Sequence, residues 1–268
     1  MEHRRQTILD QVEREGACSY EQLSKRLAVS TMTIRRDADE LARRGAVIRI
    51  VGGVQKAHAP SYLYETAVHA RLAENREWKQ AIAGKALELV RGSQSVFLDG
   101  STTCLELAKL LAVERKGLTI ITNSALACLE LGQGGDNVVI GIGGQFDANS
   151  LSFIGPQAED WARTLFVDLA FVGTKGFIAR EGTYESFLPT FRIKQIIAQQ
   201  AVELVLLADH SKFGQRSLSK VLDVAQIHTI VTDDHAPARD LSLLRRRGRQ
   251  LHLASLGSSA RRRTTHAA

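Results

Sequence analysis

The spacing of apolar residues in the first fifty positions predicts three short helices. Residues 3–15 carry one apolar side, and residues 19–27 place Leu23 and Leu27 one turn apart. A tight turn at Ala28-Val29 leads into the third helix. Helices of this length and pattern can bury one small shared core, which leaves the third helix prominent on the surface.

The third helix is predicted to have one apolar and one basic face. Ser30 is placed to cap its first turn, and Gly45 is placed to end it, because glycine tolerates positive φ. Ile34 and Leu41 share the apolar face, and Arg36 lies roughly opposite to them. The basic face is therefore free to contact a partner.

A short basic hairpin is predicted to follow this helix. Residues 47–51 alternate as in a strand, and Gly52-Gly53 turns the chain. A helix with an arginine face followed by such a wing suits the major groove of DNA, so we interpret residues 1–56 as a winged helix-turn-helix domain. The alternative is a plain three-helix bundle whose arginines are solvated. The candidate DNA-binding residues are Ser30, Thr31, Thr33, Arg35, Arg36, Arg43 and Arg49.

The remainder of the chain alternates apolar runs with helical patterns. Each run ends in small polar or glycine residues, and the runs are residues 95–98, 118–121, 137–141, 169–172, 203–207 and 229–231. Continuous apolar strands alternating with helices predict an α/β domain with a mostly parallel sheet covered on both faces. We predict a linker over 57–74, this domain over 75–235, and a C-terminal extension with a basic, disordered tail over 236–268.

The polar ends of these runs are the candidate ligand site, because ligands of open parallel sheets sit beyond the carboxyl ends of the strands. Residues 99–103 join a strand to a helix and could hold a phosphate on backbone N–H groups and hydroxyls; the alternative is an ordinary capped turn. Lysines near the carboxyl ends of the other strands could neutralise an anion, or they could be ordinary surface charges. The candidate ligand-binding residues are Asp99, Gly100, Ser101, Thr102, Thr103, Asn123, Ser124, Gly143, Gly144, Thr174, Lys175, Gly176, Lys194 and Lys212.

The sequence resembles the DeoR-type transcriptional repressors. The motif VSxxTIRRD is carried by Val29, Ser30, Thr33, Ile34, Arg35, Arg36 and Asp37, and the wing G-x-V-I-R follows it. The resemblance extends to about residue 235. It implies a DNA reader joined to a sensor for a phosphorylated sugar, whose fold is shared with ribose-phosphate isomerases and CoA-transferases.

Three features depart from that family or carry no assigned chemistry. Val51 replaces a usual histidine before the wing glycines, and residues 189–191 replace acidic residues that often precede the position of Lys194. The run Arg71, Asn75 and Lys79 is interpreted as packing between domains or subunits.

The composition indicates the cellular compartment and shows how far the net charge supports DNA binding. The 268 residues include three cysteines without CxxC spacing, which favours a reducing cytoplasm over disulfides or a zinc site. No signal peptide or membrane span is predicted. The net charge is +6, but residues 245–268 hold seven arginines and no acid, so the excess lies largely in the tail. The DNA interpretation therefore depends on where the charges are placed.

The resulting expectation is a repressor of a carbohydrate operon that binds double-stranded operator DNA. A phosphorylated sugar would release it, and two-fold symmetric half-sites would require at least a dimer. One alternative is an isomerase-like enzyme with a DNA-binding appendage, and another is an activator. We assign no catalytic residue, metal or cofactor, and we interpret His210 as a capping or packing residue.

Overall fold

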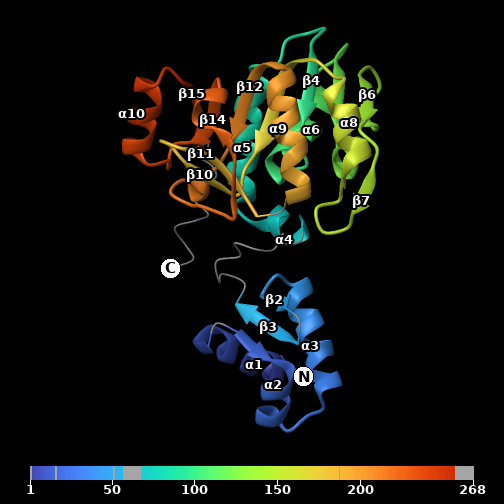
Figure 1. Cartoon of the computed structure of the whole chain (residues 1–268), viewed down its shortest axis with the longest axis vertical. Helices are drawn as coiled ribbons and strands as arrows, with labels where there is room; N and C mark the ends of the chain where they lie inside the picture. The colour runs from blue at the N-terminus through green and yellow to red at the C-terminus, as the bar shows by residue number, and fades with distance from the viewer. Residues whose placement is uncertain (1, 16, 51, 57–67, 187, 257–268) are drawn as a thin grey trace. The chain divides into compact units, whose positions relative to one another are not determined.

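The chain divides into two compact units, Met1–Ser61 and Tyr62–Ala268. A computed structural model describes residues 2–15, 17–50, 52–56, 68–186 and 188–256 (Figure 1). Val51 and the tail from residue 257 therefore lie outside the described residues. Below, the two parts are called the N-terminal and C-terminal units.

The N-terminal unit packs three helices against a small antiparallel sheet of strand order β1-β3-β2. Its elements are α1 (Glu2–Glu15), β1 (Ala17–Ser19), α2 (Tyr20–Leu27), α3 (Thr31–Arg43), β2 (Val47–Ile50) and β3 (Gly53–Lys56). The three helices and the wing strand are confirmed. Strand β1 was not foreseen, since three residues are too few to show a period and its pairing partner β3 is distant in sequence.

Local signals explain where α3 begins and ends. The Ser30 hydroxyl accepts a hydrogen bond from the Thr33 N–H at 3.2 Å, which confirms the predicted cap. Gly45 follows the helix with φ of 72°, as expected for a residue that ends a helix. Ile34 and Leu41 are buried with residues of α1 and α2 in one apolar core.

The Asp37 carboxylate ties α3 to α1. It is 2% exposed and accepts hydrogen bonds from Arg4 Nε at 2.5 Å and Arg5 Nε at 3.1 Å. Burial would raise the pKa of Asp37, but the two guanidinium groups hold it below its ordinary value. This residue of the TIRRD motif is therefore part of the fold of the unit.

The C-terminal unit is built on a parallel sheet of strand order β15-β14-β12-β9-β4-β5-β6. The strands are β4 (Ser95–Leu98), β5 (Thr119–Thr122), β6 (Val138–Gly141), β9 (Val167–Gly173), β12 (Ala201–Leu207), β14 (Thr229–Asp233) and β15 (Gln250–Ala254). All six predicted apolar runs lie in this sheet. The predicted parallel α/β fold is confirmed.

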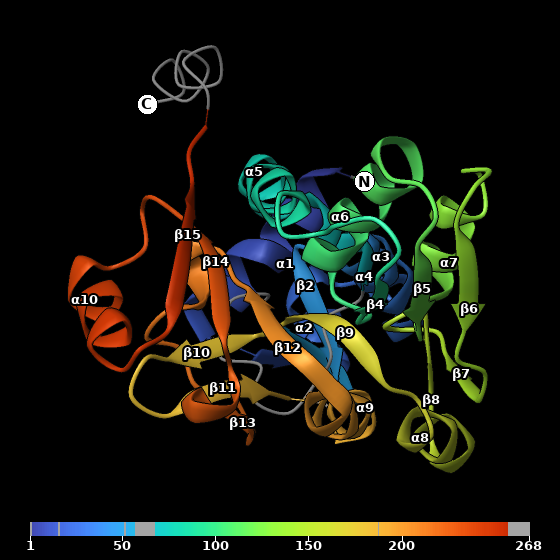
Figure 2. The ribbon, with the colours of Figure 1, turned by 90° about the horizontal axis from the view of Figure 1, so that it is seen from above.

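Helices cover both faces of the sheet (Figure 2). On one face lie α5 (Arg76–Leu87), α6 (Thr102–Glu114) and α7 (Ala125–Leu131), preceded by α4 (Val68–Ala73). On the other lie α8 (Pro156–Arg163), α9 (Leu188–Gln200) and α10 (Ala238–Arg246). None of the described helices has the length and apolarity needed to cross a bilayer.

Two small antiparallel sheets and two short 3-10 helices complete the C-terminal unit. Strands β7 (Gln145–Asp147) and β8 (Ser152–Ile154) form a hairpin, and β10 (Gly176–Ile178), β11 (Gly182–Glu185) and β13 (Ser219–Asp223) form the second sheet. The 3-10 helices are η1 (His210–Lys212) and η2 (Val224–Gln226).

Part of the predicted C-terminal extension belongs to the main sheet. Residues 250–254 form β15, which pairs in parallel with β14, so the predicted boundary at 235 falls inside this sheet. Helix α10 contributes Leu241 and Leu244 to the core on one face. The arginines around these leucines obscured the apolar pattern in the sequence.

We predict that Asp37→Asn destabilises the N-terminal unit by about 2–3 kcal/mol, because two charge-assisted hydrogen bonds to a buried group are weakened. Hydrogen-exchange protection of amides in α1 and α3 of the full chain measures this change. Glu21→Gln, an exposed change on α2, is the control. The pKa of Asp37 is lowered in the folded state, so its stabilisation is present above about pH 4 and is lost as the pH falls through the folded pKa. Equal protection in both variants would contradict this role.

Candidate functional site

The exposed face of α3 carries the predicted DNA-binding side chains. Thr31, Arg35 and Arg36 are exposed, whereas Ile34 and Ala38 on the opposite face are fully buried. Among the described residues, no ion-pair partner is found for Arg36. The sequence pattern therefore leaves this guanidinium available to a partner outside the chain.

The other candidate residues of the N-terminal unit make contacts within the unit. The Arg35 guanidinium lies over the Tyr20 ring, 5.4 Å from its centroid. Arg43 forms an ion pair with Glu40, and Arg49 Nη1 lies 2.7 Å from Asp39 Oδ1. The hydroxyls of Ser30 and Thr33 lie 2.9 Å apart at the start of α3. These contacts orient the side chains on one surface formed by α3 and the wing.

The C-terminal unit contains a pocket of about 730 Å³ at the carboxyl ends of β4, β5 and β9. Most of the predicted ligand-binding residues line it, namely Asp99, Gly100, Ser101, Thr102, Thr103, Asn123, Thr174, Lys175, Lys194 and Lys212. Residues distant in sequence meet here because parallel strands end at the same edge of the sheet.

Four predicted residues do not line this pocket, and three of them have a role in capping or close backbone packing. The Ser124 hydroxyl accepts from the Ala127 N–H and caps α7. A Cβ on Gly144 would lie 2.7 Å from the Ile154 carbonyl oxygen, and one on Gly176 would lie 2.4 Å from that of Gln215. Gly143 has open space around it. The glycine and hydroxyl signals here reflect turns and caps.

A buried ion triad forms the floor of the pocket. Lys194 Nζ lies 3.1 Å from Asp99 Oδ2 and 2.5 Å from Glu185 Oε1. Burial would lower the pKa of Lys194, but the charges of Glu185 and Asp99 raise it above its ordinary value. Burial would raise the pKa of Asp99, but the charge of Lys194 and hydrogen bonds from Ser101 hold it low. The lysine therefore bridges two buried carboxylates at this end of the pocket.

The loop between β4 and α6 presents unused donors to the pocket. Asp99 Oδ1 accepts from the Ser101 N–H at 2.9 Å, and the Ser101 hydroxyl accepts from the Cys104 N–H at 3.2 Å. Within the described chain, the N–H groups of Thr102 and Thr103 have no partner, and both residues line the pocket. Donors at a helix N-terminus favour an anion such as phosphate.

Two helices near the start of the unit add residues that sequence reasoning assigned only to packing. Arg71 and Lys79 line the pocket, and Lys79 Nζ donates to the Arg71 carbonyl at 2.5 Å. Burial and the like charge of Lys212, opposed by Asp209, lower the pKa of Lys79 to about 8. The spacing of Arg71, Asn75 and Lys79 suggests one helix face, but the chain breaks at Asn75, with φ of 48°, between α4 and α5. The two cations therefore meet through the packing of two helices, which the spacing alone does not reveal.

The Asn75 side chain links this segment to the loop after β12. Its Nδ2 donates to Asp209 Oδ1 at 3.0 Å and to the Ser211 hydroxyl at 3.2 Å. Asp209 is 1% exposed, and its Oδ2 has no hydrogen-bond partner among the described residues. The carboxylate lies between the charges of Lys79 and Lys212, which lower its pKa against the effect of burial.

The hairpin β7–β8 and the residues near it supply the other lining residues that the sequence did not reveal. Ser150 and Ser152 line the pocket, and a Cβ on Gly100 would lie 2.3 Å from the Ser152 hydroxyl oxygen. Glu74 and Glu185 also line it. Glu185 lies near the strand ends in the sequence as an acidic residue of the loops, but isolated residues such as Glu74, Ser150 and Ser152 give no pattern, so only the tertiary structure could identify those three.

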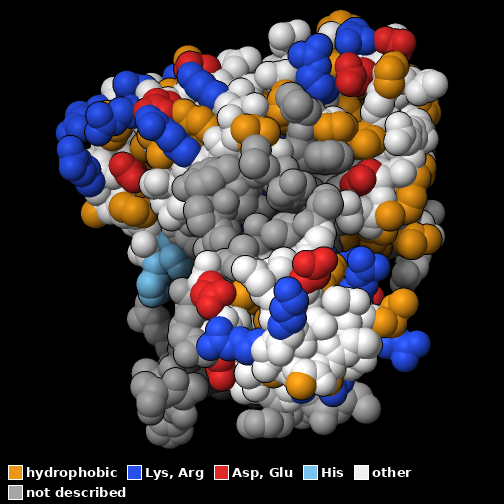
Figure 3. Space-filling view, turned by 60° about the horizontal axis from the view of Figure 1, so that its bottom comes forward, with side chains coloured by type: hydrophobic (Ala, Val, Ile, Leu, Met, Phe, Trp, Pro, Cys, Tyr) orange, Lys and Arg blue, Asp and Glu red, His pale blue; other side chains and the backbone are white. Residues whose placement is uncertain are grey.

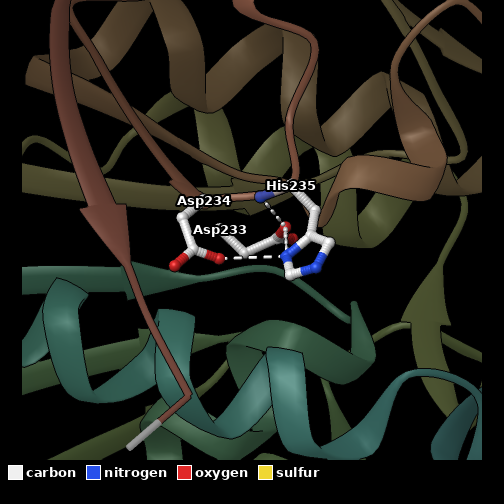
Figure 4. A group of neighbouring side chains, drawn as sticks. All are labelled: Asp233, Asp234 and His235. Carbon is white, nitrogen blue, oxygen red and sulfur yellow. Dashed lines mark hydrogen bonds and ion pairs between the residues drawn. The ribbon is translucent and has the colours of Figure 1, made fainter. Parts of the chain in front are cut away.

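A group of possible metal ligands lies at the end of β14, outside the pocket. Asp233, Asp234 and His235 bring ligand atoms within 4.8 Å of one another, and Figure 4 shows both carboxylates directed toward His235. Asp233, however, already accepts from the N–H groups of His210 and His235 at 2.8 and 3.0 Å. His210 Nδ1 also lies 3.0 Å from Asp233. The carboxylate orders two loops, so we assign it no metal.

The pocket is suited to an anionic ligand with hydroxyl groups. Its lining has two more basic than acidic side chains. Asn123 donates to the Phe153 carbonyl, while its Oδ1 is buried and has no partner among the described residues. That oxygen can accept from a ligand hydroxyl, and the donors at α6 can bind a phosphate.

Comparison with known proteins matches both units to one family. Residues 4–59 match the DeoR-like helix-turn-helix domain, and residues 74–234 match the DeoR C terminal sensor domain. The uncharacterized HTH-type transcriptional regulator YgbI of Escherichia coli strain K12 is 34% identical over 253 residues, covering 90% of this chain and 96% of that protein. The glycerol-3-phosphate regulon repressor of the same strain is 29% identical, with 92% and 96% covered.

Among solved structures, ribose 5-phosphate isomerase A of Methanocaldococcus jannaschii is similar, with a TM-score of 0.39 and 18% identity. The similarity covers 52% of this chain and 55% of that one. The fold assignment rests on the strand order described above. Taken with the two matched domains, the helix-turn-helix and the sensor sheet show that this chain belongs to the DeoR family of transcriptional regulators.

Proposed function

We propose that the protein is a repressor that binds operator DNA through α3 and the wing and is released by a phosphorylated sugar. The observation that carries this proposal is a helix-turn-helix with an available arginine face in the same chain as a pocket with free donors at a helix N-terminus. Relatives named as repressors, including one of a glycerol-3-phosphate regulon, support the same function.

The phosphate is proposed to bind at the start of α6. Thr102 and Thr103 line this space and offer N–H groups and hydroxyls as donors, and Lys79, Lys175 and Lys212 add positive charge. Asn123 and Ser150 are proposed to bind sugar hydroxyls. For release to occur, the ligand must bind the DNA-free state more tightly than the DNA-bound state.

We infer that the pocket binds its ligand without turnover. An isomerase needs a base that can take a proton next to a carbonyl. Asp99 and Glu185 are both ion-paired with Lys194, and despite burial the charge of Lys194 holds the pKa of Asp99 below its ordinary value, which makes Asp99 a weak base. Incubating the protein with pentose and hexose phosphates and assaying for isomerised product tests this inference, and any turnover would contradict it.

We also propose that the protein acts in the cytoplasm as at least a dimer. Two-fold related operator half-sites require two copies of α3 spaced about one DNA turn apart. We propose residues 1–56 as the reader, 57–74 as the linker and 75–235 as the ligand-sensing region, with α10 and β15 completing the sheet of that region. Sedimentation of the full chain measures the oligomeric state, and a monomer that binds a two-half-site operator would contradict the dimer.

Arg36→Ala is expected to weaken operator binding by about 1–3 kcal/mol if the guanidinium contacts a base, with the loss confined to certain sequences. A phosphate contact would instead weaken binding to all sequences and make the salt dependence shallower. Fluorescence anisotropy with a duplex selected by the protein from a random pool measures both. Arg26→Ala on α2, which is exposed and ion-paired with Glu15, is the control. Unchanged binding at several salt concentrations would exclude Arg36 from the interface.

Gly100→Val is expected to abolish release by the effector, because a Cβ at this position would lie 2.3 Å from the Ser152 hydroxyl oxygen. Thr102→Ala removes one donor and should weaken effector binding by about 1–3 kcal/mol. The probe is the phosphorylated sugar, from a panel of pentose and hexose phosphates, that most raises the melting temperature. For wild type at 100 times Kd, the stability should increase by about 2.7 kcal/mol.

Gly92→Val is the matched control for this experiment, since no atom lies within 4 Å of a Cβ there. Operator binding without effector should be equal in Gly100→Val, Gly92→Val and wild type. Equal release of wild type and Gly100→Val by the effector would remove this loop from the site.

Effector affinity is expected to fall as the pH rises past about 8. Lys79 has a pKa of about 8 in the free protein and must be protonated to attract an anion, so binding takes up a proton above that pH. Lys212, Asp209, Glu74 and Arg71 also act on this group. Calorimetry in buffers of different ionisation enthalpy measures the proton uptake. Lys79→Gln should abolish it, while Lys85→Gln on the same helix should retain it. Equal uptake by both variants would contradict the role of Lys79.

A further inference from the structure

A cluster of arginines lies on and around α10 and in the loop between β10 and β11, outside the pocket of the C-terminal unit. Four of them, Arg180, Arg239, Arg246 and Arg247, line one groove of about 600 Å³ together with Asp240 and Leu243. Figure 3 shows Lys and Arg side chains gathered at the left of the molecule, where α10 lies. None of these residues lines the pocket at the start of α6.

Several surface cations of the C-terminal unit are paired with acidic side chains, whereas three arginines of this groove are not paired in the described part of the chain. Lys116 pairs with Asp136 at 2.6 Å, Arg163 pairs with Asp160 at 2.5 Å, and Lys220 pairs with Asp223 at 2.7 Å. Within the described residues, the side chains of Arg180, Arg239 and Arg246 make no hydrogen bond or ion pair, and all three are exposed. Clustered like charges repel one another, so an anionic partner would be bound favourably.

Not every arginine near α10 belongs to this surface. Arg249 Nη1 donates to the carbonyls of Ala225 and Ile227 at 3.1 and 2.7 Å, which fixes the turn before β14. Arg247 Nη1 donates to the Arg180 carbonyl at 2.9 Å, which joins the end of α10 to the loop between β10 and β11. The guanidinium groups available to a partner are therefore those of Arg180, Arg239 and Arg246.

We propose that this groove binds the phosphate backbone of duplex DNA, without reading bases. The proposal rests on the proposed function, since the N-terminal unit brings the chain to DNA and raises the local concentration of phosphates at the groove. Guanidinium groups bind phosphate oxygens bidentately, and backbone contacts give affinity without sequence information. The groove has one half-buried leucine and no aromatic residue, which disfavours a protein partner, because protein interfaces have an apolar and aromatic core.

The test compares two triple variants of the full chain that remove equal charge. The first is Arg180→Gln/Arg239→Gln/Arg246→Gln, in the groove. The second is Lys116→Gln/Arg163→Gln/Arg192→Gln, at ion-paired positions on other elements. The probe is a 40-base-pair duplex of random sequence, and its affinity is measured between about 50 and 200 mM salt, where phosphate contacts dominate.

For the groove variant, the slope of log K against log salt should become shallower by up to about 2.7, since each phosphate contact contributes about 0.9. The slope of the control variant should change less than half as much. A third variant with lysine at the same three groove positions keeps the charge and should retain most of the wild-type slope. An unchanged slope in the groove variant, or equal changes in both glutamine variants, would overturn the proposal, as would a preference for an acidic protein over DNA.

Failure of this proposal is distinguishable from failure of the proposed function. Arg36→Ala alone tests DNA reading by the N-terminal unit and leaves the groove intact. If Arg36→Ala weakens operator binding while the groove variant keeps the wild-type salt slope, the repressor assignment stands and the α10 proposal is overturned.

Discussion

The burial of one carboxylate, Asp99, is the constraint on which the pocket depends. At 2% exposure this group cannot be solvated, so its charge must be balanced by donors from the chain. It accepts from the N–H groups of Ser101 and Gly173 and pairs with Lys194. These partners belong to the start of α6, the end of β9 and α9. One buried charge therefore fixes the positions of three walls of the pocket.

A second buried carboxylate, Asp209, joins the pocket to the segment that follows the linker. Asn75, at the junction of α4 and α5, donates to Asp209, and Lys79 donates back to Arg71 across the same junction. A ligand that contacts Arg71 and Lys79 thus acts on the first described helices after residue 67. These helices are the first described elements after the DNA-binding unit, and under the proposed function any coupling between ligand and DNA must be reciprocal.

The motif VSxxTIRRD serves two purposes in one helix. Ile34 is part of the core, Asp37 pairs with Arg4 and Arg5 of α1, and Arg36 remains on the exposed face. A charge at Asp37 is tolerated inside the unit only because two guanidinium groups reach it. The stability of the unit and the placement of its arginine face are consequently coupled through the orientation of α3.

By itself the sequence determined the features that depend on local periods and capping chemistry. These include α3 with its Ser30 cap, the six apolar strands and the loop at residues 99–103, because the neighbours that decide such features are only a few residues away. The pairing of β15, the lining by Arg71, Lys79 and Ser152, and the exclusion of Gly144 from the pocket were decided by tertiary structure alone. Each depends on contacts between segments far apart in the chain, and a single sequence carries no local pattern for them.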